Sequence, residues 1–326
     1  MSVPLSIDPS LFLDDAIDVE TLAFNESIIT LQAEAGDMWE NSPAQIRQAR
    51  LDGGGPFPLE ALEPTAENIT IKNANGQSTE LRIFKPKMGS ARGTYLHIHG
   101  GGWALGTADG QDERLQEIAD NCAFNCVSVN YRLAPEHPYP AGPDDCETAA
   151  MWLIDENHDL NIDTLTIGGE SAGAHLSVVT MLRLRKFLGE CPFHGANLTA
   201  GVYDLGQSPS AKNWGPLKLI LNTRDMQMFA TCYLQNGENM RDEDISPFFA
   251  DLKDMPPVLF SVGTKDLLLD DSLLMASRWH AQNGNVELDV TPGGCHVFQS
   301  FRHLKIAKES NARIDTFLNS IRCKKA

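Results

Sequence analysis

Positive charge is scarce in this sequence. Its 326 residues contain 26 lysines and arginines against 44 aspartates and glutamates, which leaves a net charge of −18. An acidic surface repels the phosphates of nucleic acids and the headgroups of anionic membranes, so we expect neither as a partner. The sequence also lacks an uninterrupted run of about 18 apolar residues, so we expect no membrane-spanning helix and no membrane insertion.

A basic, apolar leader and paired cysteines are missing as well. The first 20 residues lack a basic segment, so we expect no secretory signal. The seven cysteines form no Cys-x-x-Cys pair and no cysteine–histidine metal spacing, and their odd number argues against a disulfide framework. We therefore expect reduced thiols and a cytoplasmic location, and we expect no metal or organic cofactor.

The sequence does have a regular alternation of strand-like and helix-like apolar patterns from residue 94 onward. The expected strands are 94–100, 126–134, 164–169, 197–205, 256–266 and 286–293. The expected helices are 112–122, 144–156, 174–188, 272–284 and 303–322. Strands separated by helices indicate an α/β fold with a mostly parallel, doubly wound sheet. Asn75-Gly76, between two short strand patterns, predicts a hairpin that adds an antiparallel edge.

The N-terminal segment, residues 1–55, precedes this alternation. Its apolar residues, among them Leu22, Ile28 and Leu31, recur at helical spacing, and the stretch 52–64 that follows is rich in glycine and proline. We predict that this segment is a helical cap joined by a loop to the main domain, which takes up residues 56–326.

A second segment, residues 205–255, interrupts the alternation. It contains one expected helix, 226–233, and is otherwise loop-like. An excursion of this length inside a compact domain is usually a functional lid. We predict that it forms a second cap or lid.

Residues 169–173 read Gly-Glu-Ser-Ala-Gly and lie between the expected strand 164–169 and the expected helix 174–188. The pattern G-x-S-x-G in this context is typical of a nucleophile elbow, a tight turn whose glycines leave room for neighbouring backbone. A chance match is the alternative in a chain with 26 glycines. The position between strand and helix favours the elbow, with Ser171 as nucleophile.

Residues 99–103, His-Gly-Gly-Gly-Trp, end the strand 94–100. The backbone N–H groups of these glycines, together with that of Ala172, are suited to bind a tetrahedral oxyanion. A phosphate-binding loop is the alternative. The absence of G-x-G-x-x-G and of G-x-x-x-x-G-K-[ST] disfavours it.

An elbow serine is followed in chain order by an acid and a histidine. Asp266 ends the expected strand 256–266, and His296 lies in the loop after the strand 286–293. A carboxylate in this place orients the imidazole, which accepts and returns the serine proton. The alternatives lie on expected helices, where capping, packing or surface roles suit them better: Asp270, Asp271, His280 and His303.

Five motifs in this order resemble the hormone-sensitive-lipase-like family of α/β-hydrolases, which includes microbial carboxylesterases. They are HGGGW (99–103), YRLAPEHPYPA (131–141), GESAG (169–173), DLLLD (266–270) and HVF (296–298). GESAG is longer by one methylene than the more familiar GDSAG, and the segment around HVF lacks the glycine that often follows the histidine.

The resemblance implies an α/β-hydrolase catalytic domain in residues 56–326, with the two cap segments as the variable part. It implies Ser171 as nucleophile, His296 as general base and Asp266 as the residue that orients it. It also implies an oxyanion hole built from the backbone of Gly100, Gly101 and Ala172, and a structural turn at Tyr131-Arg132. We expect Glu170 to hydrogen-bond neighbouring backbone and hold the elbow.

The expected function is that of a serine carboxylesterase that hydrolyses small-molecule esters with short-to-medium acyl chains. Candidate substrate contacts are Trp103, Trp39 and Asp204; packing is the alternative for the tryptophans, and anchoring of the lid for the aspartate. The same constellation also serves amides, carbamates and lactones. A non-catalytic ligand receptor on this fold is a second alternative, which the presence of His296 disfavours. A homodimer is left open.

Overall fold

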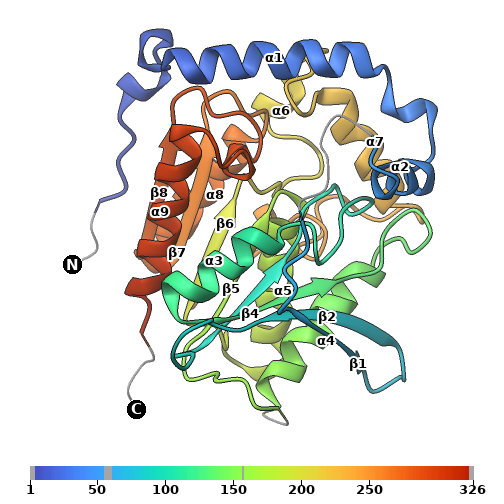
Figure 1. Ribbon diagram of the computed structural model, residues 1–326, viewed down its shortest axis with the longest axis vertical. Coiled ribbons are helices and arrows are strands. Elements are labelled where there is room, and N and C mark those ends of the chain that lie inside the picture. The colour runs from blue at the N-terminus through green and yellow to red at the C-terminus, as the bar shows by residue number, and fades with distance from the viewer. Residues whose placement is uncertain (1–3, 55–60, 156–157, 323–326) are drawn as a thin grey trace.

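One sheet runs through the part of the chain that the computed structural model describes, residues 4–54, 61–155 and 158–322 (Figure 1). In these residues eight strands lie in the order β1-β2-β4-β3-β5-β6-β7-β8. Their bounds are β1 Glu67–Lys72, β2 Ser78–Phe84, β3 Thr94–Ile98, β4 Asn125–Asn130, β5 Leu165–Glu170, β6 Gly195–Thr199, β7 Val258–Gly263 and β8 Val286–Thr291. The hairpin β1–β2 is antiparallel and β2 runs antiparallel to β4, whereas the other neighbouring strands are parallel. This is the α/β-hydrolase fold with the expected antiparallel edge.

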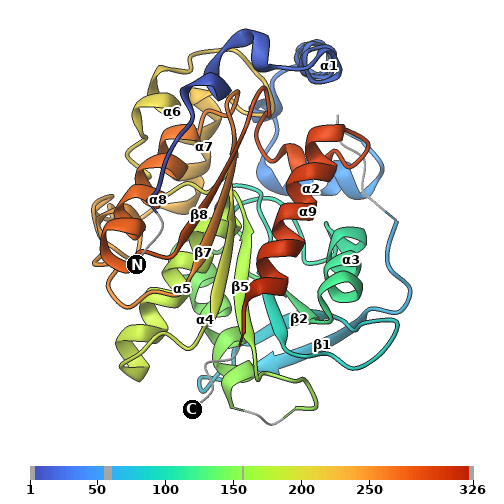
Figure 2. The same cartoon turned by 90° about the vertical axis from the view of Figure 1, so that its left-hand side faces the viewer.

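Helices cover both faces of the sheet (Figure 2). One face carries α4 (Ala141–Ile154), α5 (Ala172–Leu188) and α8 (Leu269–Asn283), and the other carries α3 (Asp112–Cys122) and α9 (Lys305–Ser320). Because both faces are covered, every residue of β3, β5, β6 and β7 is buried.

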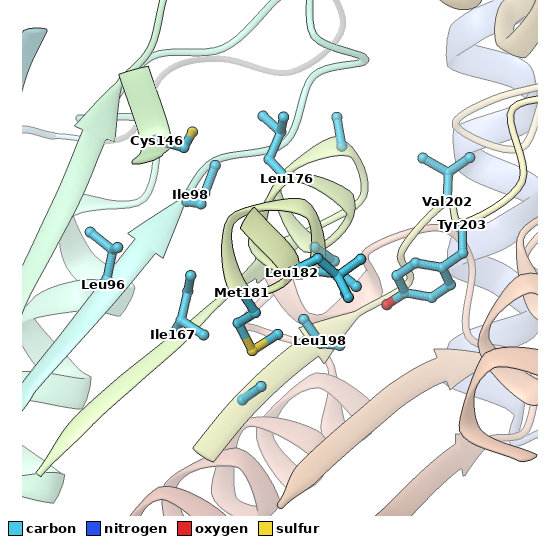
Figure 3. Close-up of a cluster of buried hydrophobic side chains, with 14 of the residues drawn as sticks. Leu96, Ile98, Cys146, Ile167, Leu176, Met181, Leu182, Leu198, Val202 and Tyr203 are labelled. Carbon is cyan, nitrogen blue, oxygen red and sulfur yellow. The ribbon is translucent and has the colours of Figure 1, made fainter. Parts of the chain in front are cut away.

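The larger core lies between the sheet and α5 (Figure 3). Ile98 and Ile167 project from adjacent parallel strands toward Leu176 and Met181 of this helix. All four side chains are completely buried. This packing holds α5, and therefore the turn that precedes it, firmly against the ends of β3 and β5.

Several strands are shorter at their carboxyl ends than expected. β4 ends at Asn130, β6 at Thr199 and β7 at Gly263, whereas the apolar patterns continue to 134, 205 and 266. The residues beyond β6 leave the sheet at Ala200, whose φ is +46°, yet many of them stay buried. Apolar periodicity alone does not separate a strand from a buried loop.

Four helices lie across the end of the sheet where the parallel strands terminate (Figure 1). They are α1 (Val19–Ala35), α2 (Pro43–Leu51), α6 (Pro209–Asn213) and α7 (Thr223–Tyr233). The helix expected at 226–233 corresponds to α7, whereas α6 has no counterpart in the expectation. The domain boundary expected at residues 55–56 lies within 55–60, outside the described residues. Shorter 3-10 turns occur at Pro9–Phe12, Asp14–Ala16, Met38–Glu40, Pro247–Phe249 and Phe298–Ser300.

Helix α1 packs on the molecule with a largely polar face. Its Asn25 Nδ2 donates to the carbonyl of Gly293 at 2.8 Å, while Leu22 and Leu31 are 43% and 40% exposed. The apolar spacing predicts the helix correctly, but of Leu22, Ile28 and Leu31 only Ile28 is buried, and the other buried residues of the helix are polar. The reason is that loop backbone under α1 offers carbonyl and amide groups, which side-chain amides can satisfy.

No helix in residues 4–54, 61–155 and 158–322 combines the length and the apolar character needed to cross a membrane. Cys122, Cys126, Cys146, Cys232 and Cys295 are free thiols, and Cys323 lies outside the described ranges.

Candidate active site

Ser171 occupies a strained turn between β5 and α5. Its φ is +55° and its ψ is −120°, a conformation that residues with a side chain rarely adopt. The flanking glycines are required by close packing, since a Cβ on Gly169 or Gly173 would lie 2.0 or 1.9 Å from the carbonyl oxygen of Ile98. This is the geometry of the expected nucleophile elbow, at the carboxyl end of the sheet.

The structure brings Ser171, His296 and Asp266 into one hydrogen-bonded row. His296 Nε2 lies 3.0 Å from Ser171 Oγ, and His296 Nδ1 lies 3.1 and 3.0 Å from the two carboxylate oxygens of Asp266. All three side chains are buried. Asp266 Oδ1 also accepts from the Leu268 N–H, which fixes the carboxylate. A histidine between a hydroxyl and a carboxylate is placed to remove the hydroxyl proton.

The loop that carries His296 is held by close backbone packing. A Cβ on Gly263, at the end of β7, would lie 1.9 Å from the carbonyl oxygen of Gly294. Immediately after the histidine, Val297 adopts a left-handed φ of +51°. Glycine adopts this conformation more easily, which gives a physical reason why a glycine suits the position that Val297 takes here.

Two other buried histidines lie near the site, and both are bound to backbone carbonyls. The ring of His99 contacts the Gly100 oxygen and that of His175 the Ile245 oxygen. Burial lowers the pKa of each to about 4. Both are therefore neutral at physiological pH and hold structure in place, whereas of these three imidazole rings only that of His296 hydrogen-bonds the Ser171 hydroxyl.

The glycine loop after β3 differs in one respect from the expected oxyanion hole. The N–H of Gly100 donates to Glu170 Oε1 at 2.7 Å and is therefore already engaged. In the described part of the chain, the N–H groups of Gly101, Gly102 and Ala172 donate to no protein acceptor. Gly102 belongs to the same motif, although the family resemblance implied only Gly100, Gly101 and Ala172 as donors. The Glu170 carboxylate reaches the Gly100 N–H, and this contact decides which N–H groups of the loop are already engaged.

The three candidate substrate contacts have different surroundings. Trp103 is 2% exposed, stacks on Tyr233 with ring centroids 4.7 Å apart, and donates to His175 Nδ1, so it packs in the core. Asp204 accepts from the Gly206 N–H at 2.8 Å and so stabilises a turn at the start of the second cap segment. The Trp103 contacts are those of a packing residue and the Asp204 carboxylate bonds a local turn, so a substrate contact stays a prediction for both residues.

Trp39 is linked to the glycine loop through Phe229 of α7. The Trp39 and Phe229 ring centroids are 4.9 Å apart, and Trp39 Nε1 donates to Asp225 Oδ1 at 2.8 Å. A Cβ on Gly102 would lie 2.4 Å from the Phe229 ring, so this ring covers the loop directly. Sequence analysis missed Phe229, whose only signal was its place in the helix expected at 226–233.

Asp270 and Asp271 hold the second cap segment. The sequence analysis expected them to cap α8, and they do not. Asp271 Oδ1 accepts from the N–H groups of Tyr203 and Asp204 at 2.7 and 3.1 Å. Asp270 Oδ2 accepts from the Ser210 N–H at 2.8 Å. The N-cap of α8 is Leu268, with no side-chain hydrogen bond. These carboxylates accept hydrogen bonds from backbone N–H groups distant in sequence instead of from the first N–H groups of α8.

Burial raises the pKa of Asp271 from 3.8 to about 6. Between these values the unfolded chain is ionised while the folded chain retains the proton, so stability falls as the pH rises through this window. We expect the free energy of unfolding of the wild type, relative to Asp271→Asn, to fall by on the order of 3 kcal/mol between pH 4 and 6 and then level off. Urea unfolding of both proteins at several pH values measures this, and a constant difference would contradict it.

The described residues contain no group of three or more histidine, cysteine, aspartate or glutamate side chains placed to hold a metal ion.

Comparison with known proteins supports the fold and places esterases among the similar structures. Residues 95–300 match the family profile described as alpha/beta hydrolase fold. A hyperthermophilic esterase from the archaeon Pyrobaculum calidifontis is 26% identical, with a TM-score of 0.81 over 91% of this chain and 97% of that one. The thermophilic carboxylesterase EstE1, from a metagenomic library, is 26% identical, with a TM-score of 0.78 over 87% and 99%. A mutant of the esterase E40 is 27% identical, with a TM-score of 0.78 over 94% and 99%.

Proposed function

This chain belongs to the hormone-sensitive-lipase-like family of the α/β-hydrolase fold, and from that premise we propose that it is a serine carboxylesterase acting on small-molecule esters. The observation that carries the proposal is the continuous hydrogen-bonded row from Ser171 through His296 to Asp266 at a strained strand–helix turn. Catalysis by such a row needs no metal or organic cofactor.

In the proposed mechanism Ser171 Oγ attacks the ester carbonyl carbon while His296 Nε2 takes its proton. Asp266 stabilises the imidazolium that forms. The alcohol departs with the proton from His296 and leaves an acyl group on Ser171. Water, deprotonated by His296, then attacks the acyl group, and the acid is released as the serine recovers its proton.

The negative charge on the tetrahedral oxygen is held by backbone N–H groups. We assign this role to Gly101, Gly102 and Ala172, because their N–H groups donate to no protein acceptor among the described residues. Ala172 directly follows Ser171, and the two glycines directly follow Gly100, where a Cβ would lie 3.4 Å from the Ser171 Cβ. Ala172 also begins helix α5, whose N-terminus favours negative charge. Gly100 is left to position the loop.

The two cap segments, residues 1–55 and 205–255, enclose the substrate in this proposal. Support comes from α1, α2, α6 and α7, which lie across the end of the sheet, and from the Phe229 ring seated on Gly102. A ring so close to the oxyanion loop leaves little room for a long chain. Short-to-medium acyl groups are therefore the proposed substrates.

Hydrolysis of p-nitrophenyl esters from acetate to palmitate tests the proposal. We expect kcat/KM to peak at short-to-medium acyl chains, and Phe229→Ala to move the peak to longer chains because it opens space beside the loop. Phe187→Ala is the matched control, since this ring on α5 is 71% exposed. A wild-type profile that peaks at palmitate would contradict the proposed acyl range.

Amides, carbamates and lactones are the alternative substrates, because the same row of side chains attacks any activated carbonyl. A butyrate ester and the matched anilide, assayed side by side, separate these activities. A folded wild type that cleaves only the anilide would make the protein an amidase. One that binds such ligands but cleaves none would be a receptor.

A further inference from the structure

The peptide group between His99 and Gly100 is held at both ends. Its N–H, on Gly100, donates to Glu170 Oε1 at 2.7 Å, and its carbonyl, on His99, accepts from the Tyr131 hydroxyl at 3.0 Å. The next residue, Gly101, supplies a proposed oxyanion donor. A peptide plane fixed on both sides limits the directions in which the following N–H group can point.

Behind Glu170 lies a second buried pair. Glu170 Oε2 is 3.0 Å from His97 Nε2, and His97 Nδ1 is 3.1 Å from Ser128 Oγ. The side chains of Glu170, His97 and Ser128 are all buried. A His97 ring that donates from Nε2 to the carboxylate and accepts at Nδ1 from the Ser128 hydroxyl satisfies both ring nitrogens. The pair holds the carboxylate in one orientation, toward Gly100.

The packing places Gly100 directly against Glu170. A Cβ on Gly100 would lie 2.8 Å from the Glu170 carbonyl oxygen and 3.3 Å from its Cγ. The loop therefore rests on the Glu170 backbone and its second methylene, and the carboxylate beyond them meets Gly100 N on one side and His97 on the other. Glu170 directly precedes Ser171, so one residue connects the nucleophile turn to the oxyanion loop.

We propose that Glu170 is a positioning residue that aligns the oxyanion loop through the Gly100 N–H, with His97 orienting its carboxylate and Tyr131 holding the opposite end of the same peptide. The proposal rests on the proposed esterase function. It assigns to Glu170 no proton transfer and no contact with substrate.

If Glu170 is a positioning residue, its replacement weakens the stabilisation of the transition state and lowers kcat, whereas substrate binding and KM change little. Glu170→Leu removes the acceptor at similar volume, and we expect kcat to fall by roughly 10- to 100-fold, less than the loss of a donor itself, with KM changed less than about threefold. Glu170→Gln keeps an acceptor for Gly100 and is expected to stay within about threefold of wild type. Tyr131→Phe releases the other end and is expected to lower kcat by roughly fivefold.

A transition-state analogue supplies the readout that a merely structural role would not move. A trifluoromethyl ketone forms a tetrahedral adduct with the serine, so its inhibition constant is expected to rise by the same factor by which kcat/KM falls. Asp289→Leu is the matched control. It removes a buried carboxylate from β8 that bonds Ser310 and Arg313, and it should lower the melting temperature without weakening the inhibitor.

The outcomes separate this inference from the proposed function. A wild type that neither hydrolyses esters nor reacts with a fluorophosphonate would overturn both. If the wild type is active and the Glu170→Leu variant folds, two results would overturn the positioning role alone. One is a kcat of the variant within twofold of wild type, and the other is a fall in kcat with unchanged inhibitor affinity. If Glu170→Leu does not fold, Tyr131→Phe decides, and unchanged kcat and inhibitor affinity in that variant would overturn the proposal.

Discussion

Replacing Ser171 by alanine is expected to reduce kcat for p-nitrophenyl butyrate hydrolysis by about 10⁴-fold or more, with the fold intact. The hydroxyl is the proposed nucleophile, and no other group contacts His296 Nε2 among the described residues. Alanine keeps the Cβ, so the strained turn with its φ of +55° is not changed further. Residual activity above the uncatalysed rate would come from the oxyanion hole and from substrate binding, not from a covalent intermediate.

Ser177→Ala is the matched control for this experiment. Ser177 lies on α5, the helix that follows Ser171, and is also buried. Its hydroxyl donates to the Gly173 carbonyl at 2.8 Å and does not hydrogen-bond His296. It should retain nearly full activity. Mass spectrometry after fluorophosphonate treatment should place the label on Ser171 in the wild type and find none in Ser171→Ala. Undiminished hydrolysis by Ser171→Ala would show that the elbow assignment is wrong.

Replacing Asp266 by asparagine is expected to lower kcat by roughly 10³- to 10⁴-fold. Both carboxylate oxygens face His296 Nδ1, which therefore carries the proton and leaves Nε2 free to accept from Ser171. An asparagine amide that donates to Nδ1 reverses the tautomer. The histidine then presents a proton to the serine hydroxyl and cannot act as a base toward it.

Steady-state kinetics of Asp266→Asn and Asp270→Asn on the same ester measure this effect. Asp270 lies four residues further along and bonds the Ser210 N–H, so its replacement is expected to change kcat by less than about threefold. Circular dichroism confirms that both variants are folded. A larger loss of kcat in Asp270→Asn than in Asp266→Asn would show that Asp266 is not the acid of the row.

Local sequence was sufficient to predict the parts of the site that lie on single turns. Tight turns are imposed by neighbouring residues, so glycines at 169 and 173 around Ser171 predict the elbow from a few letters. The alternation of strands and helices predicts the fold and places Asp266 and His296 after successive strands. Parallel strands end at the same edge of a sheet, which is why the structure brings these two side chains to Ser171.

Features that depend on partners distant in the chain were not predictable. Which glycine N–H is free depends on the Glu170 carboxylate, 70 residues beyond Gly100, and the buried side of α1 depends on a carbonyl 268 residues beyond Asn25. Each of these contacts joins a side chain to the backbone of a distant residue, and backbone groups are present at every residue, so no sequence pattern marks the pairing.

The sequence by itself therefore determined the fold, the strained turn at Ser171 and the order of the candidate acid and histidine, because these follow from local geometry and from the rules of parallel sheets. Only the tertiary structure decided that Gly100 is held by Glu170, that Asp271 fastens the second cap segment, and that Phe229 covers the oxyanion loop. These contacts form only when loops from separate strands come together, because several groups can then bind the same donor or acceptor or fill the same space.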